Sequence, residues 1–496
     1  MSIDRFLDRD TFFIDGDWAA PATSDVLEVV SPHSEEVVAR VPEGSTADID
    51  AAVAAARRAL DEGPWPRLSP QERIDVVQAF SGLYAAKLAE MAELITVEMG
   101  SPTSFANLAQ SPAPWMQIET FLGIAREFPW EEERPGALGA PVVVRREPVG
   151  VVAAIPPWNV PQFTIMSKLV PALLAGCTVV VKPAPETPLD GYLLAELLTE
   201  AGVPAGVVNI VAAGREGGEH LVAHPGVDKV AFTGSTAARR RIAAVCGEQL
   251  KRVSLELGGK SAAIVLDDAD LATTMAGLRF TALMNSGQAC VAQTRILASR
   301  RNYSAVVDAL VETVASMPVG EPADPATEIG PLVAQRQQER VEKYIALGQE
   351  EGARVALGGN GMPDGLDRGW YVRPTVFADV DNRMRIAQEE IFGPVACLIP
   401  FDDEADAIAQ ANDIAYGLSS YVWTENTGRA HRVAAAVEAG MCFVNSQNVR
   451  DLRQPFGGTK ASGTGREGGT WSYEVFLEPK NVAVSLGSHH IPRWGV

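Results

Sequence analysis

The stretch NSGQACVAQTR, residues 285–295, holds one cysteine, Cys290, among small and polar residues. A cysteine in such a loop can attack a carbonyl carbon as a thiolate, or it can be a small residue that fills a core. The other cysteines lie in apolar runs or in a predicted helix: Cys177, Cys246, Cys397 and Cys442. Buried thiols behave as small hydrophobic groups, so Cys290 is the candidate nucleophile.

A covalent intermediate on cysteine needs a base that activates water, and Glu256 in VSLELGGK (253–260) is the candidate. Its neighbours are apolar, so burial should raise the pKa of its carboxyl towards neutrality, as a general base requires. The alternative is a glutamate on the solvated face of a strand.

An oxyanion needs a hydrogen-bond donor that is fixed in advance, and the loop IPPWNVP (155–161) offers one. Pro157 and Pro161 brace Trp158 and Asn159 after a predicted strand. The amide of Asn159 is therefore a candidate oxyanion donor. The alternative is a turn asparagine that satisfies only its local backbone.

Two strand ends are suited to a dinucleotide. In AFTGST (231–236) a strand ends at Thr233, and Gly234 and Ser235 open a helix whose free N–H groups suit a diphosphate. Lys182 follows a buried strand in VVVKPAPETP (179–188), at the edge where doubly wound sheets bind ligands. Neither pattern is specific alone, because ordinary βα turns and solvated lysines look the same.

Together these residues are suited to one reaction. The Cys290 thiolate attacks an aldehyde, and Asn159 and the Cys290 backbone amide hold the oxyanion. Hydride leaves to a nicotinamide, and water deprotonated by Glu256 hydrolyses the thioester.

The surrounding elements indicate a parallel sheet covered on both faces. Short β-rich runs lie at residues 149–155, 177–183, 207–211, 229–234 and 261–266, with a helix at 189–202 between the middle ones, and a weaker alternation follows over 270–450. Nearer the N-terminus we expect a hairpin at 12–18 around an Asp-Gly turn, a helix over 45–60, and a helix that opens at Ser69 and continues through residue 95.

Composition excludes several classes of protein. The 496 residues predict two to four domains, and the net charge of −21 argues against a nucleic-acid partner. There is no CxxC pair or zinc-ligand spacing, so no metal is expected, and none of His220, His224 or His431 has a motif partner. The longest apolar run, 169–181, is too short for a membrane span, and we expect a cytoplasmic protein.

Seven ordered motifs resemble those of the NAD(P)-dependent aldehyde dehydrogenase superfamily. They are PWNVP, KPAPETP, AFTGST, LELGGK, GQACVAQTR, EEIFGPV (389–395) and PFGGTKASGTGRE (455–467). The resemblance implies an α/β fold with a Rossmann-type cofactor domain (1–129 and 149–258) and an α/β catalytic domain (259–458). A small β bridging or oligomerisation arm (130–148 and 459–496) would join subunits into a homodimer or homotetramer, with Arg252 and Arg466 at the interface.

The same resemblance assigns roles. It makes Cys290 the nucleophile, Glu256 the base, Asn159 the oxyanion donor, and Lys168 and Glu467 members of a proton relay. Lys182 is expected at the adenosine ribose, Gly234 and Ser235 at the diphosphate, and Glu390 and Phe392 at the nicotinamide riboside. The complete set expected to bind the cofactor is Ile155, Trp158, Lys182, Gly214, Gly218, Thr233, Gly234, Ser235, Leu257, Glu390 and Phe392.

Two departures from the family pattern fall at the adenosine end. Pro185 stands where many NAD-preferring relatives have glutamate, with Glu186 one place later, and Arg239 replaces a common glycine. Both changes would ease a 2′-phosphate, so NAD is expected as cofactor with NADP as the alternative.

The aligned motifs also predict the substrate entrance. Its expected lining is Val160, Thr164, Ser167, Met284, Val291, Arg450 and Phe456. Several of these are smaller than the aromatics common in relatives, which predicts a wide tunnel for medium-length aliphatic, terpenoid or aromatic aldehydes. Arg450 offers the alternative of a semialdehyde carboxylate.

Two other functions stay open at this point. A CoA-acylating (semi)aldehyde dehydrogenase would keep the cysteine but typically lack Glu256. A non-catalytic structural relative should have lost Cys290, Glu256 or Asn159, and all three are present.

Overall fold

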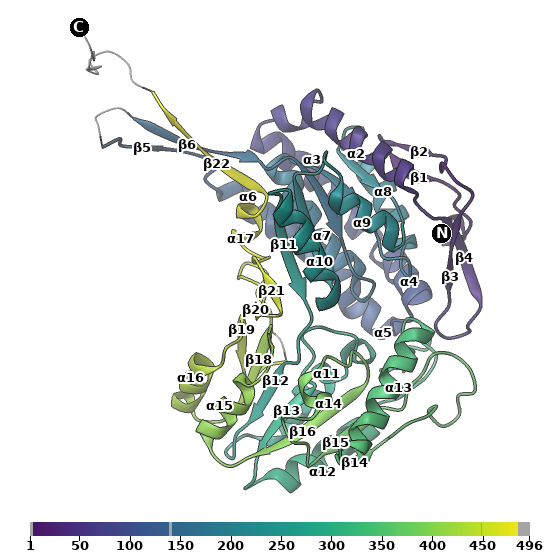
Figure 1. Cartoon of the computed structure of the whole chain (residues 1–496), viewed down its shortest axis with the longest axis vertical. Coiled ribbons are helices and arrows are strands. Elements are labelled where there is room, and N and C mark those ends of the chain that lie inside the picture. The colour runs from purple at the N-terminus through teal and green to yellow at the C-terminus, as the bar shows by residue number, and fades with distance from the viewer. Residues whose placement is uncertain (1–2, 138–140, 448, 485–496) are drawn as a thin grey trace.

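The protein has an α/β fold built on two large sheets (Figure 1). The computed structural model describes residues 3–137, 141–447 and 449–484. Within these ranges the two large sheets have helices on both faces, and three smaller sheets lie outside them. None of the described helices is long and apolar enough to cross a bilayer.

The first large sheet carries a parallel core. In spatial order its strands are β2 (Asp17–Ala19), β1 (Phe12–Ile14), β9 (Val208–Ile210), β8 (Thr178–Val181), β7 (Val151–Ile155), β10 (Lys229–Gly234), β11 (Arg252–Leu257) and β21 (Gly463–Thr464). Strands β8 and β9 add on one side of β7, and β10 and β11 add on the other. The order therefore reverses between β7 and β10, and their carboxyl ends border the crevice where open α/β sheets bind ligands.

Helices cover both faces of this sheet, as the continuous apolar strands predict. One face is covered by α3 (Pro70–Ala85), α4 (Leu88–Met99), α6 (Pro112–Glu127), α7 (Pro161–Ala175) and α8 (Leu189–Glu200). The other is covered by α2 (Thr46–Asp61), α9 (Arg215–Ala223) and α10 (Thr236–Glu248).

The second large sheet is parallel except at its first strand. In spatial order its strands are β14 (Arg354–Leu357), β15 (Thr375–Ala378), β16 (Val395–Phe401), β13 (Arg295–Ser299), β12 (Ala262–Val265), β18 (Ser419–Trp423) and β19 (Met441–Val444). Its helices are α11 (Leu271–Thr281) and α12 (Tyr303–Ala315) on one face, with α13 (Gln335–Glu350), α14 (Arg385–Gln388), α15 (Glu404–Asn412) and α16 (Thr427–Ala436) on the other. The run at 261–266, predicted with the first four strands, lies in this sheet instead, and β11 takes its place in the first.

A three-stranded arm projects from the upper body (Figure 1). Its central strand β6 (Val142–Pro148) pairs antiparallel with β22 (Leu477–Ala483) and with β5 (Glu131–Arg134). Residues 138–140 and 485–496, which fall in the predicted bridging segments, lie outside the described residues. The domain boundaries at 258 and 458 stay a prediction, although β21 lies beyond 458 and joins the first sheet.

The remaining elements are short. They are α1 (Asp4–Leu7), η1 (Trp65–Arg67), α5 (Thr103–Phe105), the π-turn η2 (Ala106–Gln110), η3 (Met284–Gly287), α17 (Trp471–Glu474), the hairpin of β3 (Val26–Val30) and β4 (Val37–Pro42), and the pair of β17 (Tyr416–Gly417) and β20 (Thr459–Lys460).

Local sequence signals placed several elements correctly. Asp15 and Gly16 both have positive φ and turn β1 into β2, as the Asp-Gly pair predicts. Ser45 and Ser69 each cap a helix with a complete capping box.

The helix predicted from Ser69 through residue 95 is two helices. Helix α3 ends at Ala85 and α4 begins at Leu88, because Lys87 leaves helical geometry at φ −116° and ψ 12°. No Gly or Pro marks this break. We attribute it to tertiary packing, since α3 packs on α6 and α7 as well as on α8, whereas α4 packs on α8 and on η2.

Candidate active site

The candidate base, Glu256, lies near the end of β11, the last parallel strand of the first sheet. Glu256 stands beside Thr233 in the parallel register of β10 and β11, and it is 3% exposed. Neither of its carboxylate oxygens has a hydrogen-bond partner among the described residues. Burial raises the pKa of Glu256 well above its usual range, Glu467 raises it further, and Lys168 and Arg466 oppose the rise. The alternative of a solvated glutamate is therefore wrong.

The candidate nucleophile follows a strained turn. Asn285, Ser286 and Gly287 all have positive φ, and a Cβ at Gly287 would collide with the carbonyl oxygen of Gly393. This turn brings Cys290 to a half-buried position beside Val291 and Phe456. The buried residues of this turn anchor the loop that carries Cys290.

The Cys290 thiol is held in its neutral form. Burial raises the pKa of Cys290 to about 12, the carboxylates of Glu390 and Glu256 add to the rise, and Arg450 opposes it. The two carboxylates and the arginine thus act on the same sulfur, which places all three around it.

Asn159 lies beside the nucleophile loop and is almost completely buried. Its Nδ2 donates to the carbonyl oxygen of Gln288 at 2.8 Å. An amide nitrogen has two hydrogens, so the second remains for an oxyanion. The backbone carbonyl oxygen of Asn159 accepts from Gln110, which lies in no predicted motif, and from Asn285, the first residue of the stretch that holds Cys290.

Lys168 and Glu467 form a buried ion pair next to the base. Lys168 Nζ donates to Glu467 Oε1 at 2.8 Å and to Thr233 Oγ1 at 2.6 Å. Since Thr233 is the strand neighbour of Glu256, the two predicted relay residues and the base share one cluster.

The predicted adenosine end is a cradle of lysine and glycine. Lys182 Nζ donates to the carbonyl oxygens of Pro183 and Ala213, and burial lowers its pKa to about 8. A Cβ at Gly218 would touch the Lys182 side chain at 3.4 Å, and one at Gly214 would press on Glu43. Glycine at both positions leaves the room that a ribose needs.

The predicted diphosphate end is the start of α10. Ser235 caps this helix through its hydroxyl, which accepts from Ala238 N. Ile155 pairs with Phe232, and Leu257 with Gly234, so the predicted residues of β7, β10 and β11 end at one edge. A helix N-terminus at this edge suits a diphosphate.

The predicted nicotinamide end lies between the two sheets. Glu390 Oε1 accepts from Gly259 N at 3.0 Å, and a Cβ at Gly258 would collide with its carboxylate. Trp158 meets Phe392 edge-on at 5.4 Å between ring centres. These contacts fit a cofactor that passes from the first sheet towards Cys290.

Arg239 and Glu186, at the predicted adenosine end, each have a partner elsewhere in the fold. Arg239 Nη1 donates to the carbonyl oxygen of Ala461 at 2.7 Å and so holds the turn between β20 and β21. Glu186 forms an ion pair with Arg336 of α13, and its charge acts on Lys182.

The predicted substrate entrance is apolar apart from one arginine. Met284, Val291 and Phe456 pack with Leu418 and Met441 next to Cys290. The hydroxyls of Thr164 and Ser167 donate to backbone carbonyl groups at the start of α7, and the place of both residues at the entrance stays a prediction. Val160 precedes that helix.

Arg450 is the one charged residue predicted to line this entrance. Its guanidinium stacks on Phe456 at 3.9 Å and on Phe163 at 4.9 Å from the ring centres. Burial lowers its pKa to about 10, and its Nε has no hydrogen-bond partner among the described residues.

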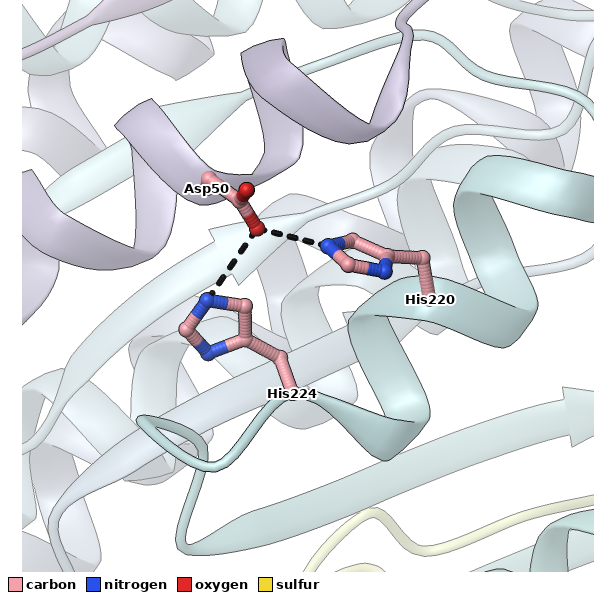
Figure 2. A group of neighbouring side chains, drawn as sticks. All are labelled: Asp50, His220 and His224. Atoms are coloured by element: carbon pink, nitrogen blue, oxygen red, sulfur yellow. Dashed lines mark hydrogen bonds and ion pairs between the residues drawn. The ribbon is translucent and has the colours of Figure 1, made fainter.

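His220 and His224, which have no motif partner in the sequence, share one partner in the fold. Figure 2 shows His220 and His224 of adjacent turns pointing at Asp50 of α2, with Nε2 to Oδ1 distances of 2.6 and 3.2 Å. Gly226 N donates to His224 Nδ1 at 2.9 Å, so neutral His224 carries its proton on Nε2 and donates it to Asp50. A metal on that nitrogen would need the proton on Nδ1, facing the Gly226 donor, so the cluster favours a hydrogen-bonded link between α2 and α9.

Comparison with known proteins gives a single family. Residues 18–482 match the model of the aldehyde dehydrogenase family. Geranial dehydrogenase of Castellaniella defragrans is 44% identical, with 96% of this chain and 99% of the relative covered. 3-Succinoylsemialdehyde-pyridine dehydrogenase of a Pseudomonas species is 43% identical, with the same coverage of each. The crystal structure of a Mycobacterium tuberculosis aldehyde dehydrogenase complexed with NAD+ superposes with a TM-score of 0.95 at 47% identity, covering 97% of this chain and 99% of that one.

Proposed function

Because this chain belongs to the aldehyde dehydrogenase family, and is therefore an NAD(P)-dependent enzyme that oxidises aldehydes to carboxylic acids, we propose that Cys290 is its nucleophile and Glu256 its base. The observation that carries the proposal is that one segment borders both groups: Phe456 packs on the same apolar cluster as Cys290, and a Cβ on the next residue, Gly457, would lie 2.7 Å from Glu256 Oε1. Asn159 reaches the Cys290 loop through Gln288.

In the proposed reaction the sulfur of Cys290 bonds to the aldehyde carbon and its proton leaves to Glu256. The oxyanion accepts from the free N–H of Asn159 and from the backbone amide of Cys290. NAD(P)+, when bound, accepts the hydride of the aldehyde carbon. The acyl group is left as a thioester on Cys290.

Hydrolysis of the thioester needs a second proton transfer. Once the first proton has left Glu256, its carboxylate accepts a proton from water, whose oxygen bonds to the acyl carbon as the carbon–sulfur bond breaks and releases the acid and the Cys290 thiolate. Lys168 and Glu467 lie next to Glu256 and are proposed to carry its surplus proton away from the site.

We propose NAD as the preferred cofactor, held by the cradle of Lys182, Gly214 and Gly218. Arg239 is engaged by the carbonyl oxygen of Ala461, so its guanidinium is not free for a 2′-phosphate. The Glu186 carboxylate near Lys182 would repel such a phosphate. The related structure complexed with NAD+ supports the same choice.

For the substrate we propose a medium-length apolar aldehyde, such as an aliphatic, terpenoid or aromatic one. The entrance offers Met284, Val291 and Phe456 to such a chain, and the similar geranial dehydrogenase is named for a terpenoid aldehyde. The second candidate is a semialdehyde with a distal carboxylate. It is favoured by the buried guanidinium of Arg450, whose Nε is unpartnered among the described residues, and by the similar 3-succinoylsemialdehyde-pyridine dehydrogenase.

Kinetics on paired aldehydes separates the two candidates. Arg450→Leu keeps the stacking volume and removes the charge. For an apolar enzyme, kcat/KM of octanal should change by less than about threefold. For a carboxylate-binding enzyme, kcat/KM of succinic semialdehyde should fall by 10–100-fold in Arg450→Leu, as loss of a charged hydrogen bond implies.

Reduction of NAD and NADP over a graded aldehyde panel tests the function itself. Wild-type protein should form reduced cofactor, and Cys290→Ala should form none while still binding NAD. Cys442→Ala is the matched control, since Cys442 is a half-buried thiol of β19 that we assign no role. Full turnover by Cys290→Ala would exclude the proposed nucleophile.

The alternatives make distinct predictions in the same assay. A CoA-acylating enzyme would form acyl-CoA and need CoA for turnover, whereas Glu256 favours hydrolysis. A non-catalytic relative would bind NAD without reducing it.

We further propose a cytoplasmic homodimer or homotetramer joined through the β5–β6–β22 arm, a projecting sheet with unpaired outer strands among the described residues.

A further inference from the structure

The carbonyl oxygen of Asn159 is held by two side-chain amides from distant segments. Gln110 Nε2 donates to it at 3.0 Å from the π-turn η2. Asn285 Nδ2 donates to it at 2.9 Å from the turn that precedes Cys290. Both acceptor positions of one carbonyl are thereby filled, which fixes the peptide plane and hence the direction of the Asn159 side chain.

A third hydrogen bond closes the group into a ring. Asn159 Nδ2 donates to Gln288 O at 2.8 Å, and Asn285 Nδ2 also lies 3.5 Å from that oxygen. Gln288 Nε2 in turn donates to Asn285 O at 3.2 Å. The loop after β7 and the nucleophile loop are therefore joined at a set spacing, two residues before Cys290.

This ring is buried and is built on strained backbone. Gln110 and Asn285 are each 2% exposed, so neither can exchange its partner for water. Gln110 ends a π-turn, and Asn285 lies at φ +54° next to Ser286 at +59°. Strain of these kinds persists where the surroundings enforce it, and it concentrates at functional sites.

We infer that Gln110 and Asn285 are positioning residues that aim the Asn159 amide at the oxyanion formed on Cys290. The inference rests on the proposed role of Asn159. Its physical reason is that an oxyanion donor must be fixed before charge develops, and a misplacement of about 1 Å costs up to roughly 10²-fold in rate. Neither side chain needs to touch the substrate.

A double-mutant cycle with Asn159→Ala tests the inference. Gln110→Met keeps the length of the side chain and removes the donor. We expect kcat to fall about 10–100-fold, with KM for NAD unchanged. In the Asn159→Ala background the same substitution should change kcat by less than about twofold, because the amide that it aims is gone.

Gln117→Met is the matched control. Gln117 is also a buried glutamine, on α6, and its Oε1 likewise lacks a partner among the described residues. Its replacement should leave kcat unchanged. Asn285→Gly is the second variant, since glycine keeps the positive φ of that turn, and it should behave as Gln110→Met does in both backgrounds.

The outcomes separate the inference from the proposed function. Equal losses of kcat from Gln110→Met with and without Asn159 would overturn the inference and indicate general damage to the fold. An unchanged kcat in Gln110→Met and Asn285→Gly, while Asn159→Ala loses activity, would also overturn it. An unchanged kcat in Asn159→Ala itself would overturn the oxyanion role first, and the inference with it.

Discussion

Lys168 and Glu467 lie 299 residues apart in the chain, and their Nζ and Oε1 atoms lie 2.8 Å apart in the fold. The pair is buried against Thr233, directly beside the strand position of Glu256. Its two charges act in opposite directions on the base: Glu467 raises the pKa of Glu256, and Lys168 lowers it. Burial is the largest cause of the raised pKa of Glu256, and the state of the pair shifts that pKa further.

Glu467→Gln should move the acid limb of the kcat profile to lower pH. The substitution removes the carboxylate that raises the pKa of Glu256 and leaves the lysine that lowers it. Since the base works in its ionised form, activity would persist to lower pH than in the wild type. The measurement is kcat between pH 5 and 9, with Glu438→Gln, an exposed partner of Lys460, as control. A limb that moves to higher pH would contradict the role given to Glu467.

The same substitution should cost stability. Lys168 is 1% exposed, and it would keep the Thr233 hydroxyl and the new amide oxygen as hydrogen-bond acceptors but lose its counterion. A buried charge that loses its counterion costs about 3–5 kcal/mol. Denaturant unfolding of Glu467→Gln at pH 7 would give this difference, and Lys168→Met/Glu467→Gln should recover much of it.

Glu390→Gln should make the Cys290 thiol more reactive in the protein without cofactor. After burial, the Glu390 carboxylate is the largest cause of the raised pKa of Cys290, and its own pKa is about 7. At pH 8 the wild-type carboxylate is ionised and suppresses the thiolate, whereas the amide is not. Iodoacetamide should therefore alkylate Glu390→Gln several-fold faster.

The control for this prediction is the neighbouring residue. Glu389 pairs with Arg385 and Tyr344, and it is not among the groups that act on Cys290. Glu389→Gln should alkylate at the wild-type rate. Equal acceleration in both variants would show that loop opening, and not charge, controls the thiol.

Gly287→Ala should abolish activity and destabilise the protein by more than 1 kcal/mol. Gly287 has φ +75°, and a Cβ there would meet the backbone of Gly393. Gly352→Ala separates the two costs, since Gly352 has φ +92° in open space. It should lose only about 1 kcal/mol and keep its activity. Thermal unfolding and NADH formation measure both, and an active Gly287→Ala would show that the turn tolerates a shift of the nucleophile.

Arg239→Ala should leave the ratio of kcat/KM for NAD and NADP within about twofold of the wild type. The guanidinium is engaged with the carbonyl oxygen of Ala461 and holds the β20–β21 turn. Its loss should instead lower stability by about 1.5–3 kcal/mol, as expected for a charged hydrogen bond. A selective loss of NADP activity would show that Arg239 serves the 2′-phosphate, as its sequence position first suggested.

Sequence could predict the parts of the site that repeat a local rule. Strand runs, the Asp-Gly turn and the serine caps depend on neighbours in the chain, and each formed as expected. The crevice at β7 and β10 follows from the order of strands and helices. The candidate residues Cys290, Glu256 and Asn159 lay in short stretches whose residue types suggested their roles, and the family resemblance assigned the same roles.

The remainder depends on contacts between distant segments. The break at Lys87 carries no Gly or Pro, because it depends on the different packing partners of α3 and α4. Gln110 holds Asn159 from a stretch without any motif, and Asp50 meets His220 only once α2 lies on α9. Arg239 occupied a position that suggested phosphate binding, yet its contact with Ala461 depends on a turn more than two hundred residues later.

The closing of the first sheet by β21 has a consequence for the protein during its synthesis. The ribosome completes Cys290, Asn159 and Glu256 long before it adds Gly463, Thr464 and Glu467. At 5–20 residues per second this interval is on the order of ten seconds or more. Until then the first sheet lacks its last strand and Lys168 lacks its counterion. A nascent chain therefore carries Cys290, Asn159 and Glu256 for some time before it can complete the first sheet and the Lys168–Glu467 ion pair.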